Sequence, residues 1–515
     1  MDVTQILMLI TILVYLAAMV GIGAVLAKQN QTTDDFYLGG RTLGPLVTAM
    51  SAEASDMSSW LLMGLPGVAY LSGTADAAWT AIGLAIGTYV NWLVVAKRLR
   101  NYTHVCGNST TLPLFFSNRY RDNKRILSVI AALLIIIFFV PYTASGFAAC
   151  GKLFANLFGM DYLPAMLISA IVIVAYTTLG GFLAASTTDF VQSIVMTIAI
   201  VVVFGFGISK VGSFSAVMDN AKSMAGYFSL THTHDVATGT ASPYSLLQIF
   251  STLAWGLGYF GMPHVLLRFM AIGDANKLKL SRRVATVWVV ISMAVSVFIG
   301  VIGNAMTKAD VLPTLKDPET IILVVADLIS KHGVLATIIA GLILAGILAA
   351  TMSTADSQLL AASSSASQNI LKEVFMKDMS EKTGMLIARI TVLVIALIGV
   401  FIARNPDSSV FQIVSFAWAG FGASFGPLVL LALFWKRSTF QGALCGMVSG
   451  GVMVFVWKFL IRPMGGALGI YELLPAFLLG LAVNVIVSLL TPAPSREVQD
   501  EFDNCLLYTS PSPRD

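Results

Sequence analysis

Apolar runs long enough to cross a lipid bilayer follow one another along almost the whole of this 515-residue chain. A bilayer core about 30 Å thick takes roughly 20 apolar residues of helix. Hydrophobic residues make up 57% of the sequence and charged residues only 11%, a balance that would give a water-soluble domain an apolar surface. Because the runs are continuous and do not alternate with polar residues, they are typical of helices and not of barrel strands. We therefore predict an all-α polytopic membrane protein.

The positions of these runs predict about thirteen transmembrane helices within residues 1–490. Their approximate ranges are 6–27, 43–72, 77–96, 127–155, 162–179, 189–209, 245–271, 284–306, 333–366, 385–403, 409–434, 440–461 and 470–490.

Lysine and arginine gather in alternate loops. The basic loops are 97–125, 277–283, 372–382 and 436–437. Basic residues are retained on the cytoplasmic side of a membrane, so we expect these loops inside the cell and the intervening loops outside. An odd number of helices then places the N-terminus outside and the C-terminus in the cytoplasm, in a cell inner (plasma) membrane.

The tail, residues 491–515, is polar, and from Cys505 onward it is unlike the rest of the sequence. Segments that do not belong to the natural fold should be set aside openly. We expect the end of this tail to be artefactual and leave it out of the fold prediction.

Two of the predicted spans are interrupted by residues that a lipid-facing helix avoids. The segment Ser51–Trp60 holds two carboxylates, Glu53 and Asp56, and four hydroxyl groups, and the segment Trp255–Pro263 holds three glycines and a proline. Such residues weaken the helical hydrogen-bond ladder. Interrupted segments at corresponding places in two halves are typical of inverted-repeat transporters, whose unwound backbone binds cations and substrate. The alternative is that both segments are kinked helices with polar packing contacts.

A third polar stripe lies in the predicted span 333–366. Ser353, Asp356 and Ser357 share one helix face because they are three and four residues apart. Hydroxyl and carbonyl oxygens can replace the hydration shell of a monovalent cation, and an ionisable group inside a membrane is a functional candidate. The alternative is that these serines bond only to their own helix backbone.

A series of motifs in order along the chain resembles the sodium/solute symporter family, and most closely its bacterial members that carry proline. The motifs are Gly39–Pro45, Ser55–Ser58, Tyr176–Phe182, Trp255–Gly261, Met352–Thr354, Trp418–Gly422 and Gln441–Ala443. The resemblance implies a LeuT-type fold with two inverted five-helix repeats, about 43–210 and about 245–435. Both breaks then fall in the first helix of a repeat.

The same resemblance implies site residues. The expected sodium (Na+) ligands are the backbone carbonyls of Ala54, Met57 and Ala350 and the hydroxyls of Ser353 and Thr354. The expected substrate pocket is an aromatic cage of Trp60, Tyr142, Trp255, Tyr259 and Pro263. Asp56 matches a position needed for sodium coupling, and Arg41 is either part of an inner gate or a positive-inside anchor.

Glu53 and Asp356 depart from some relatives, which carry small or hydroxyl residues at these positions. Some family members bind a second sodium ion at positions that match Asp189, Ser353, Asp356 and Ser357. One hypothesis is therefore a second cation or proton site in this chain. The other is that Asp356 pairs with a buried donor, or shares a proton with Glu53.

The function expected from these features is sodium-coupled import of L-proline by alternating access. The alternatives are a sodium symporter for another small solute, such as pantothenate, a sialic acid or a sugar, and a membrane solute sensor. An enzyme is not expected, because the five histidines are scattered and no nucleophile motif or Cys/His metal cluster is present.

Overall fold

The chain folds almost entirely into helices, in a computed structural model that describes residues 2–27, 32–376, 379–405 and 409–509. The elements up to the first hairpin strand are α1 (Val3–Ala27), α2 (Thr33–Leu38), η1 (Gly39–Arg41), α3 (Pro45–Ser59), η2 (Trp60–Gly64), α4 (Leu65–Ser72), α5 (Thr74–Val90), η3 (Asn91–Val95), α6 (Ala96–Val105), α7 (Leu112–Arg119), α8 (Ile126–Phe158), α9 (Tyr162–Val211) and α10 (Phe214–Ser223).

The second half begins with an antiparallel hairpin, β1 (His232–His234) and β2 (Ala241–Pro243). The helices that follow are α11 (Leu246–Leu253), η4 (Ala254–Gly261), α12 (Pro263–Ala271), η5 (Ala275–Lys277), α13 (Leu278–Lys308), η6 (Pro318–Thr320), α14 (Ile321–Ser330), α15 (Val334–Ser364), η7 (Ser365–Phe375), α16 (Glu381–Ala403), α17 (Val410–Phe434), α18 (Phe440–Val456), η8 (Trp457–Ile461), η9 (Arg462–Met464), η10 (Gly466–Gly469), α19 (Leu473–Leu490) and α20 (Arg496–Thr509).

The prediction of a polytopic helical membrane protein is confirmed. The described residues contain 10 helices that are long and apolar enough to span a membrane, and each coincides with a predicted span. The other predicted spans correspond to the shorter apolar helix Tyr162–Ala175 and to the two interrupted segments. The predicted helices 162–179 and 189–209 are joined, because α9 runs for 50 residues with a kink at Gly181, where φ is 62°. The count of about thirteen stays a prediction.

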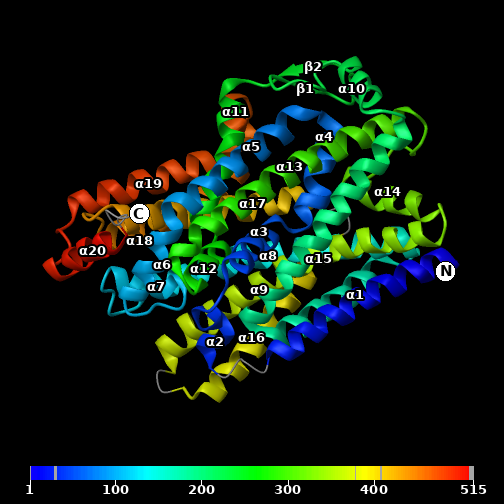
Figure 1. The fold of residues 1–515 in the computed structure, drawn as a ribbon. Coiled ribbons are helices and arrows are strands. Elements are labelled where there is room, and N and C mark those ends of the chain that lie inside the picture. The colour runs from blue at the N-terminus through cyan, green and yellow to red at the C-terminus, as the bar shows by residue number, and fades with distance from the viewer. Residues whose placement is uncertain (1, 28–31, 377–378, 406–408, 510–515) are drawn as a thin grey trace.

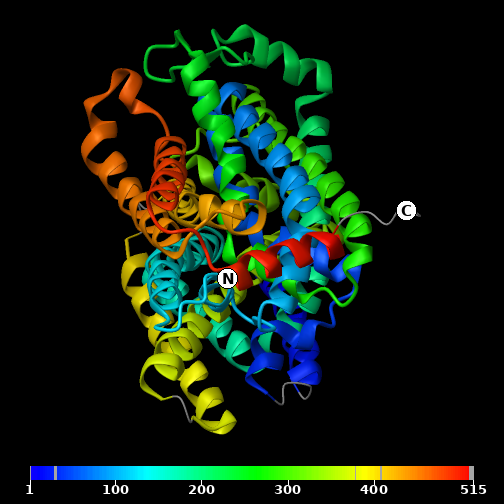
Figure 2. The same cartoon turned by 90° about the vertical axis from the view of Figure 1, so that its left-hand side faces the viewer.

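The polar loops lie at two ends of the helical body. Figures 1 and 2 both show the β1–β2 hairpin and α10 at one end, and α2 with the end of η7 and the start of α16 at the other. These ends carry loops that the distribution of lysine and arginine predicts on opposite sides of the membrane. The helices α15 and α17 are the most buried of the long spans, and α1, α16 and α18 lie at the periphery.

The polar tail is helical from Arg496 to Thr509. The helix α20 packs against α6, and Cys505 is fully buried. The segment that we expect to be artefactual, from Cys505 onward, includes the end of this helix. The last residues of the segment, 510–515, lie outside the described residues.

The first predicted break is a local departure from helical geometry at Ser58, where φ is 50° and ψ is −171°. This conformation costs a residue with a side chain about 1–3 kcal/mol. The chain then continues as a π-helical stretch, η2, before α4 begins. The interruption is therefore a specific bend, and every residue from Thr48 to Ser59 is buried.

The second predicted break is the 3₁₀ stretch η4, which ends at Gly261. Met262 follows in an extended conformation, with φ −78° and ψ 106°, and Pro263 starts α12. Its glycines allow close approach of other elements. A Cβ atom at Gly258 would overlap the indole of Trp418, and one at Gly261 would overlap the carbonyl oxygen of Phe421. The glycine spacing therefore serves packing against α17 as well as interrupting the helix.

Candidate functional site

The two breaks and the polar stripe of α15 meet in the interior of the molecule, where Figure 1 shows α3, α8, α15 and α17 crossing near its centre. The contacts of α3 with α15 and with α12, and of η4 with α17, bring together segments about 160 to 300 residues apart in the sequence. The predicted functional segments thus share one region of the fold.

The predicted sodium ligands on α3 and α15 are in direct contact. The Ser353 hydroxyl donates to the Ala54 carbonyl oxygen at 2.9 Å, and also lies 3.2 Å from that of Ala350. Thr354 Oγ1 donates to the Ala350 carbonyl at 3.0 Å. The Met57 carbonyl accepts the Trp60 N–H across the bend. These oxygens are buried and uncharged, which suits a hard monovalent cation.

Asp56 links the two broken helices. Its Oδ2 accepts a hydrogen bond from the Tyr259 hydroxyl at 2.7 Å, and its backbone carbonyl accepts one from the Tyr142 hydroxyl at 3.1 Å. His264 Nε2 of α12 lies 3.8 Å from the other carboxylate oxygen. Asp56 thus joins α3, α8, η4 and α12 around the first break.

The two unusual carboxylates have different neighbours. Glu53 Oε1 accepts from Trp92 Nε1 of η3 at 2.9 Å, whereas Asp356 Oδ1 accepts from the Ser357 hydroxyl at 3.2 Å. Within the described residues, no hydrogen bond joins Glu53 to Asp356. The structure therefore gives no support to a proton shared between them.

A buried arginine that the sequence prediction missed stands at the centre of the predicted second cation site. Arg268 Nη2 lies 3.1 Å from Asp189 Oδ2 and 2.5 Å from the Ser357 hydroxyl. Its Nε donates to the Ser51 hydroxyl at 3.0 Å, and Ser51 donates to Asp189 at 2.6 Å. An ionisable residue in the predicted span 245–271 was the signal that could have identified it.

Four of the five predicted pocket residues surround one small cavity or touch its lining. Its lining residues are Asp56, Met57, Trp60, Leu84, Tyr142, Trp255, Val414 and Trp418. Tyr259 contacts this lining through Trp418, with ring centres 5.1 Å apart. Pro263 starts α12 and does not line the cavity. The water-accessible volume is about 10 Å³, close to the space of one water molecule, so the aromatic cage is closed.

Helix α17 supplies aromatic and apolar residues that the sequence did not single out. The Phe411 ring lies 5.8 Å from that of Trp60 and 5.6 Å from that of Trp255. The Glu319 carboxylate fixes this end of α17, because it accepts the N–H groups of Val410 and Phe411 at 3.1 Å each. No local sequence pattern connects Phe411 to the two breaks.

A larger cavity of about 310 Å³ lies on the hairpin side of the aromatic cage. Tyr244 and Asp76 line it and are joined by a hydrogen bond of 2.9 Å. Trp255 lines both this cavity and the small one, and Phe411 lines the larger one. These two rings therefore separate a polar vestibule from the cage.

Arg41 ties the opposite end of the site together. It has a left-handed backbone, with φ 56°, and donates to the carbonyl oxygens of Met270 and Ser109 at 2.7 Å each. These contacts join η1 to the end of α12 and to the loop before α7. Both predicted roles of Arg41 are compatible with this position.

The sequence profile of the sodium:solute symporter family matches residues 36–450. The chain belongs to this family. It is therefore a multi-pass membrane protein and a sodium-coupled solute symporter, as the resemblance implied.

Three relatives of this symporter cover nearly the whole chain. The Bacillus subtilis osmoregulated proline transporter OpuE is 39% identical over 95% of this chain and 96% of its own length. The Escherichia coli sodium/proline symporter is 41% identical over 96% of this chain and 95% of its own. The high-affinity proline transporter PutP of Bacillus subtilis is 41% identical over 94% and 98%.

Solved structures of other symporters share the fold. A sodium-coupled sialic acid symporter in a substrate-bound outward-open state matches with a TM-score of 0.77 and 18% identity, over 95% of this chain and 99% of its own. The nucleobase-cation-symport-1 transporter Mhp1 matches with a TM-score of 0.52 and 13% identity, over 91% and 98%. The LeuT-type fold expected for this symporter is confirmed.

Replacing Arg268 with methionine should destabilise the symporter by about 3–5 kcal/mol, because Asp189 would be left as a buried charge without its partner. Adding Asp189→Asn in the same chain should recover part of the loss. The measurement is the unfolding free energy of both variants and of Asp189→Asn alone in detergent. If the loss of unfolding free energy in the double variant equals the sum of the losses in the two single variants, the ion pair has no energetic role.

Proposed function

We propose that this symporter imports L-proline together with Na+. The observation that carries the proposal is that relatives named for proline transport align over 94–96% of the chain at 39–41% identity. The closed aromatic cage supports it, because a small apolar ring needs packing surfaces and few hydrogen-bonding side chains.

In this proposal the sodium ion binds where α3 meets α15. Its ligands are the carbonyls of Ala54, Met57 and Ala350 and the hydroxyls of Ser353 and Thr354. The hydroxyls of Ser353 and Thr354 already lie within hydrogen-bond distance of the carbonyls of Ala54 and Ala350. They would turn their lone pairs to the ion, which replaces its hydration shell.

Proline would occupy the cage between Trp60, Tyr142, Trp255 and Tyr259, with its ring against the aromatic faces. Its carboxylate would face backbone N–H groups exposed at a helix break. Since the cavity is nearly filled in this structure, binding requires Trp255 and Phe411 to separate. Pro263 would act through the start of α12 and not through substrate contact.

The cluster around Arg268 would act as a fixed ion-pair element and not as a second sodium site. Arg268 already places a positive charge against Asp189 and Ser357. Asp356 lies one residue from this contact and adds a second carboxylate. A further cation would have to enter beside the guanidinium, against its charge.

The domain and topology predictions complete the proposal. The two repeats, about 43–210 and about 245–435, would rock around the site, and Arg41 would close its inner end, where it holds Met270 and Ser109. Inward movement of Na+ is favoured by about 2.3 kcal/mol per 100 mV of membrane potential. The protein would lie in the inner membrane with its N-terminus outside and its C-terminus in the cytoplasm.

Liposomes that contain the symporter should accumulate radiolabelled L-proline when an inward sodium gradient is imposed, and not with a potassium gradient. Substituting Ser353→Ala and Thr354→Ala together should reduce gradient-driven uptake at least tenfold, because two ligand oxygens are lost. The matched control is Ser364→Ala with Ser365→Ala, which removes two hydroxyls at the junction of α15 and η7 that, among the described residues, bond only to the Ala361 carbonyl.

Sodium-driven uptake of another solute in place of proline would reject the proposed substrate and keep the family mechanism. Absence of sodium-driven transport of any small solute by a folded preparation would reject transport and favour a sensor.

Replacing Asp356 with serine should leave the Hill coefficient for sodium unchanged, since Arg268 remains the cation of this cluster. Initial rates of proline uptake across a range of sodium concentrations give the coefficient. A lower coefficient in the variant, with the native value retained in Ser364→Ala, would establish a second sodium site at Asp356.

A fluorescent protein that matures only in the cytoplasm should fluoresce when fused to the C-terminus, and not when fused to the N-terminus. The predicted inside position of the loops rich in lysine and arginine is the reason. The reverse pattern would overturn the assigned orientation.

A further inference from the structure

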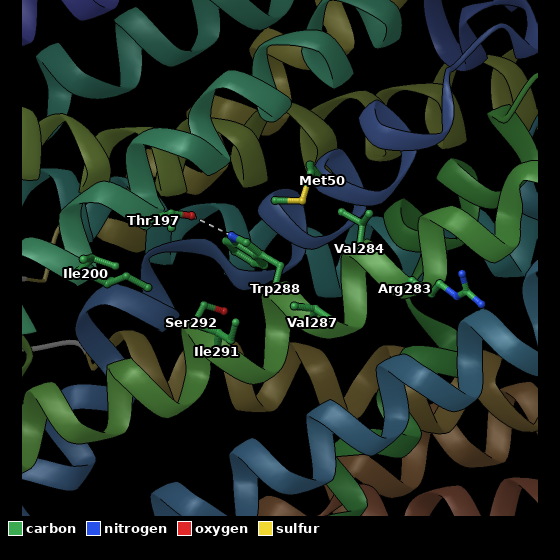
Figure 3. Close-up of a pocket in the computed structure, with 10 residues that line it drawn as sticks. Met50, Thr197, Ile200, Arg283, Val284, Val287, Trp288, Ile291 and Ser292 are labelled. Atoms are coloured by element: carbon green, nitrogen blue, oxygen red, sulfur yellow. Dashed lines mark hydrogen bonds between the residues drawn. The ribbon is translucent and has the colours of Figure 1, made fainter.

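A groove of about 490 Å³ lies on the outer surface between α9 and α13, away from the substrate cage. Figure 3 shows it with Thr197 and Ile200 on one wall, Val284, Val287 and Ile291 on the other, and Met50 between them in the upper part of the view. We propose that this groove binds one anionic phospholipid, with an acyl chain along the groove and the headgroup at Arg283.

The walls of the groove indicate an apolar occupant. Val287 is 59% exposed and Ile291 55% exposed, and Val201 on α9 is 53% exposed. Both helices are long and apolar enough to span a membrane, so these side chains face hydrocarbon. A chain of methylene groups is the ligand that matches such a surface at this depth.

A specific hydrogen bond between α9 and α13 defines the groove, which is not a gap between loosely packed helices. Trp288 of α13 donates its indole N–H to Thr197 Oγ1 of α9 at 2.8 Å, which the dashed line in Figure 3 marks. This bond ties the two walls together and leaves the indole lining the groove. The spacing of the walls is therefore fixed by a directional contact.

The charge at one end of the groove indicates an anionic headgroup. Arg283 lines the groove, and Lys279 precedes it by four residues on the same face of α13. Both side chains are exposed, and the part of the chain that the structure describes offers neither of them a hydrogen bond or an ion pair. The helix α13 contains no aspartate or glutamate. A phosphate ester supplies the missing negative charge.

The positions of the basic residues and of the apolar walls along α13 agree with a phospholipid and not with a free anion. The basic residues stand at the first two turns of α13, beside a loop predicted to be cytoplasmic, and the apolar walls extend from there into the span. Lysine and arginine at this level attract anionic lipid headgroups. Only a ligand with a charged head and an apolar chain contacts both parts.

The lipid would touch a helix of the transport site. Met50 is contributed by α3, and the next residue, Ser51, bonds to Arg268 and Asp189. A lipid in the groove would therefore contact the part of α3 that precedes the first break.

The test uses the full chain in liposomes and measures tryptophan quenching by phospholipids with brominated acyl chains. The chain has 8 tryptophans, so the contribution of Trp288 is taken as the difference between the parent and Trp288→Phe. Brominated phosphatidylglycerol should quench this contribution at a lower mole fraction than brominated phosphatidylcholine, by roughly fivefold for each basic side chain involved.

Substituting Lys279→Gln and Arg283→Gln together should bring the two lipids to equal quenching. The matched control is Arg282→Gln, because the Arg282 guanidinium faces the Tyr89 ring, 5.5 Å from its centre. Equal quenching in the parent, or a preference that survives the double substitution, would overturn the proposal. Quenching by neither lipid would show that another copy of the chain covers the groove, and would also overturn it.

Discussion

The structure depends on how the backbone groups at its two helix breaks are satisfied inside a membrane. A lipid environment offers no water to bond a free carbonyl or N–H group, so an interrupted helix persists only where protein surrounds it. At the first break, side chains perform this task, since Ser353 bonds the Ala54 carbonyl and Tyr142 bonds that of Asp56. The helices that carry these side chains, α15 and α8, must therefore pack against α3 at the break.

Charges in the interior follow the same constraint. Arg268 and Asp189 are both almost completely buried, and each would be costly alone. Their pairing joins α9 to α12, and the hydroxyls of Ser51 and Ser357 add α3 and α15. The part of α3 before the bend is thus attached to α12 through a buried network of hydrogen bonds and one ion pair, which water does not reach.

The local parts of this arrangement could be predicted from the sequence, and the long-range parts could not. Polar residues or glycines inside apolar spans marked both breaks, and the structure shows them at Ser58 and η4. Arg268 carried a comparable signal, as a charge within a span, and was missed. Phe411 carried none, because its role arises only where α17 packs beside Trp60. Which helices meet is decided by tertiary packing, and one sequence does not reveal it.

In the proposed mechanism, the coupling between ion and substrate has a simple physical origin. The Ala54 carbonyl accepts a hydrogen bond from Ser353, a proposed sodium ligand on α15, and the Asp56 carbonyl accepts one from Tyr142 of the proposed substrate cage. Both belong to the single turn of α3 that ends at the bend of Ser58. Ordering this turn at one site lowers the cost of ordering it at the other, and the effect must be reciprocal, with typical coupling energies of about 1–3 kcal/mol. A cation and a small solute can therefore be linked without touching each other, since one turn of α3 bonds both a proposed sodium ligand and a wall of the proposed cage.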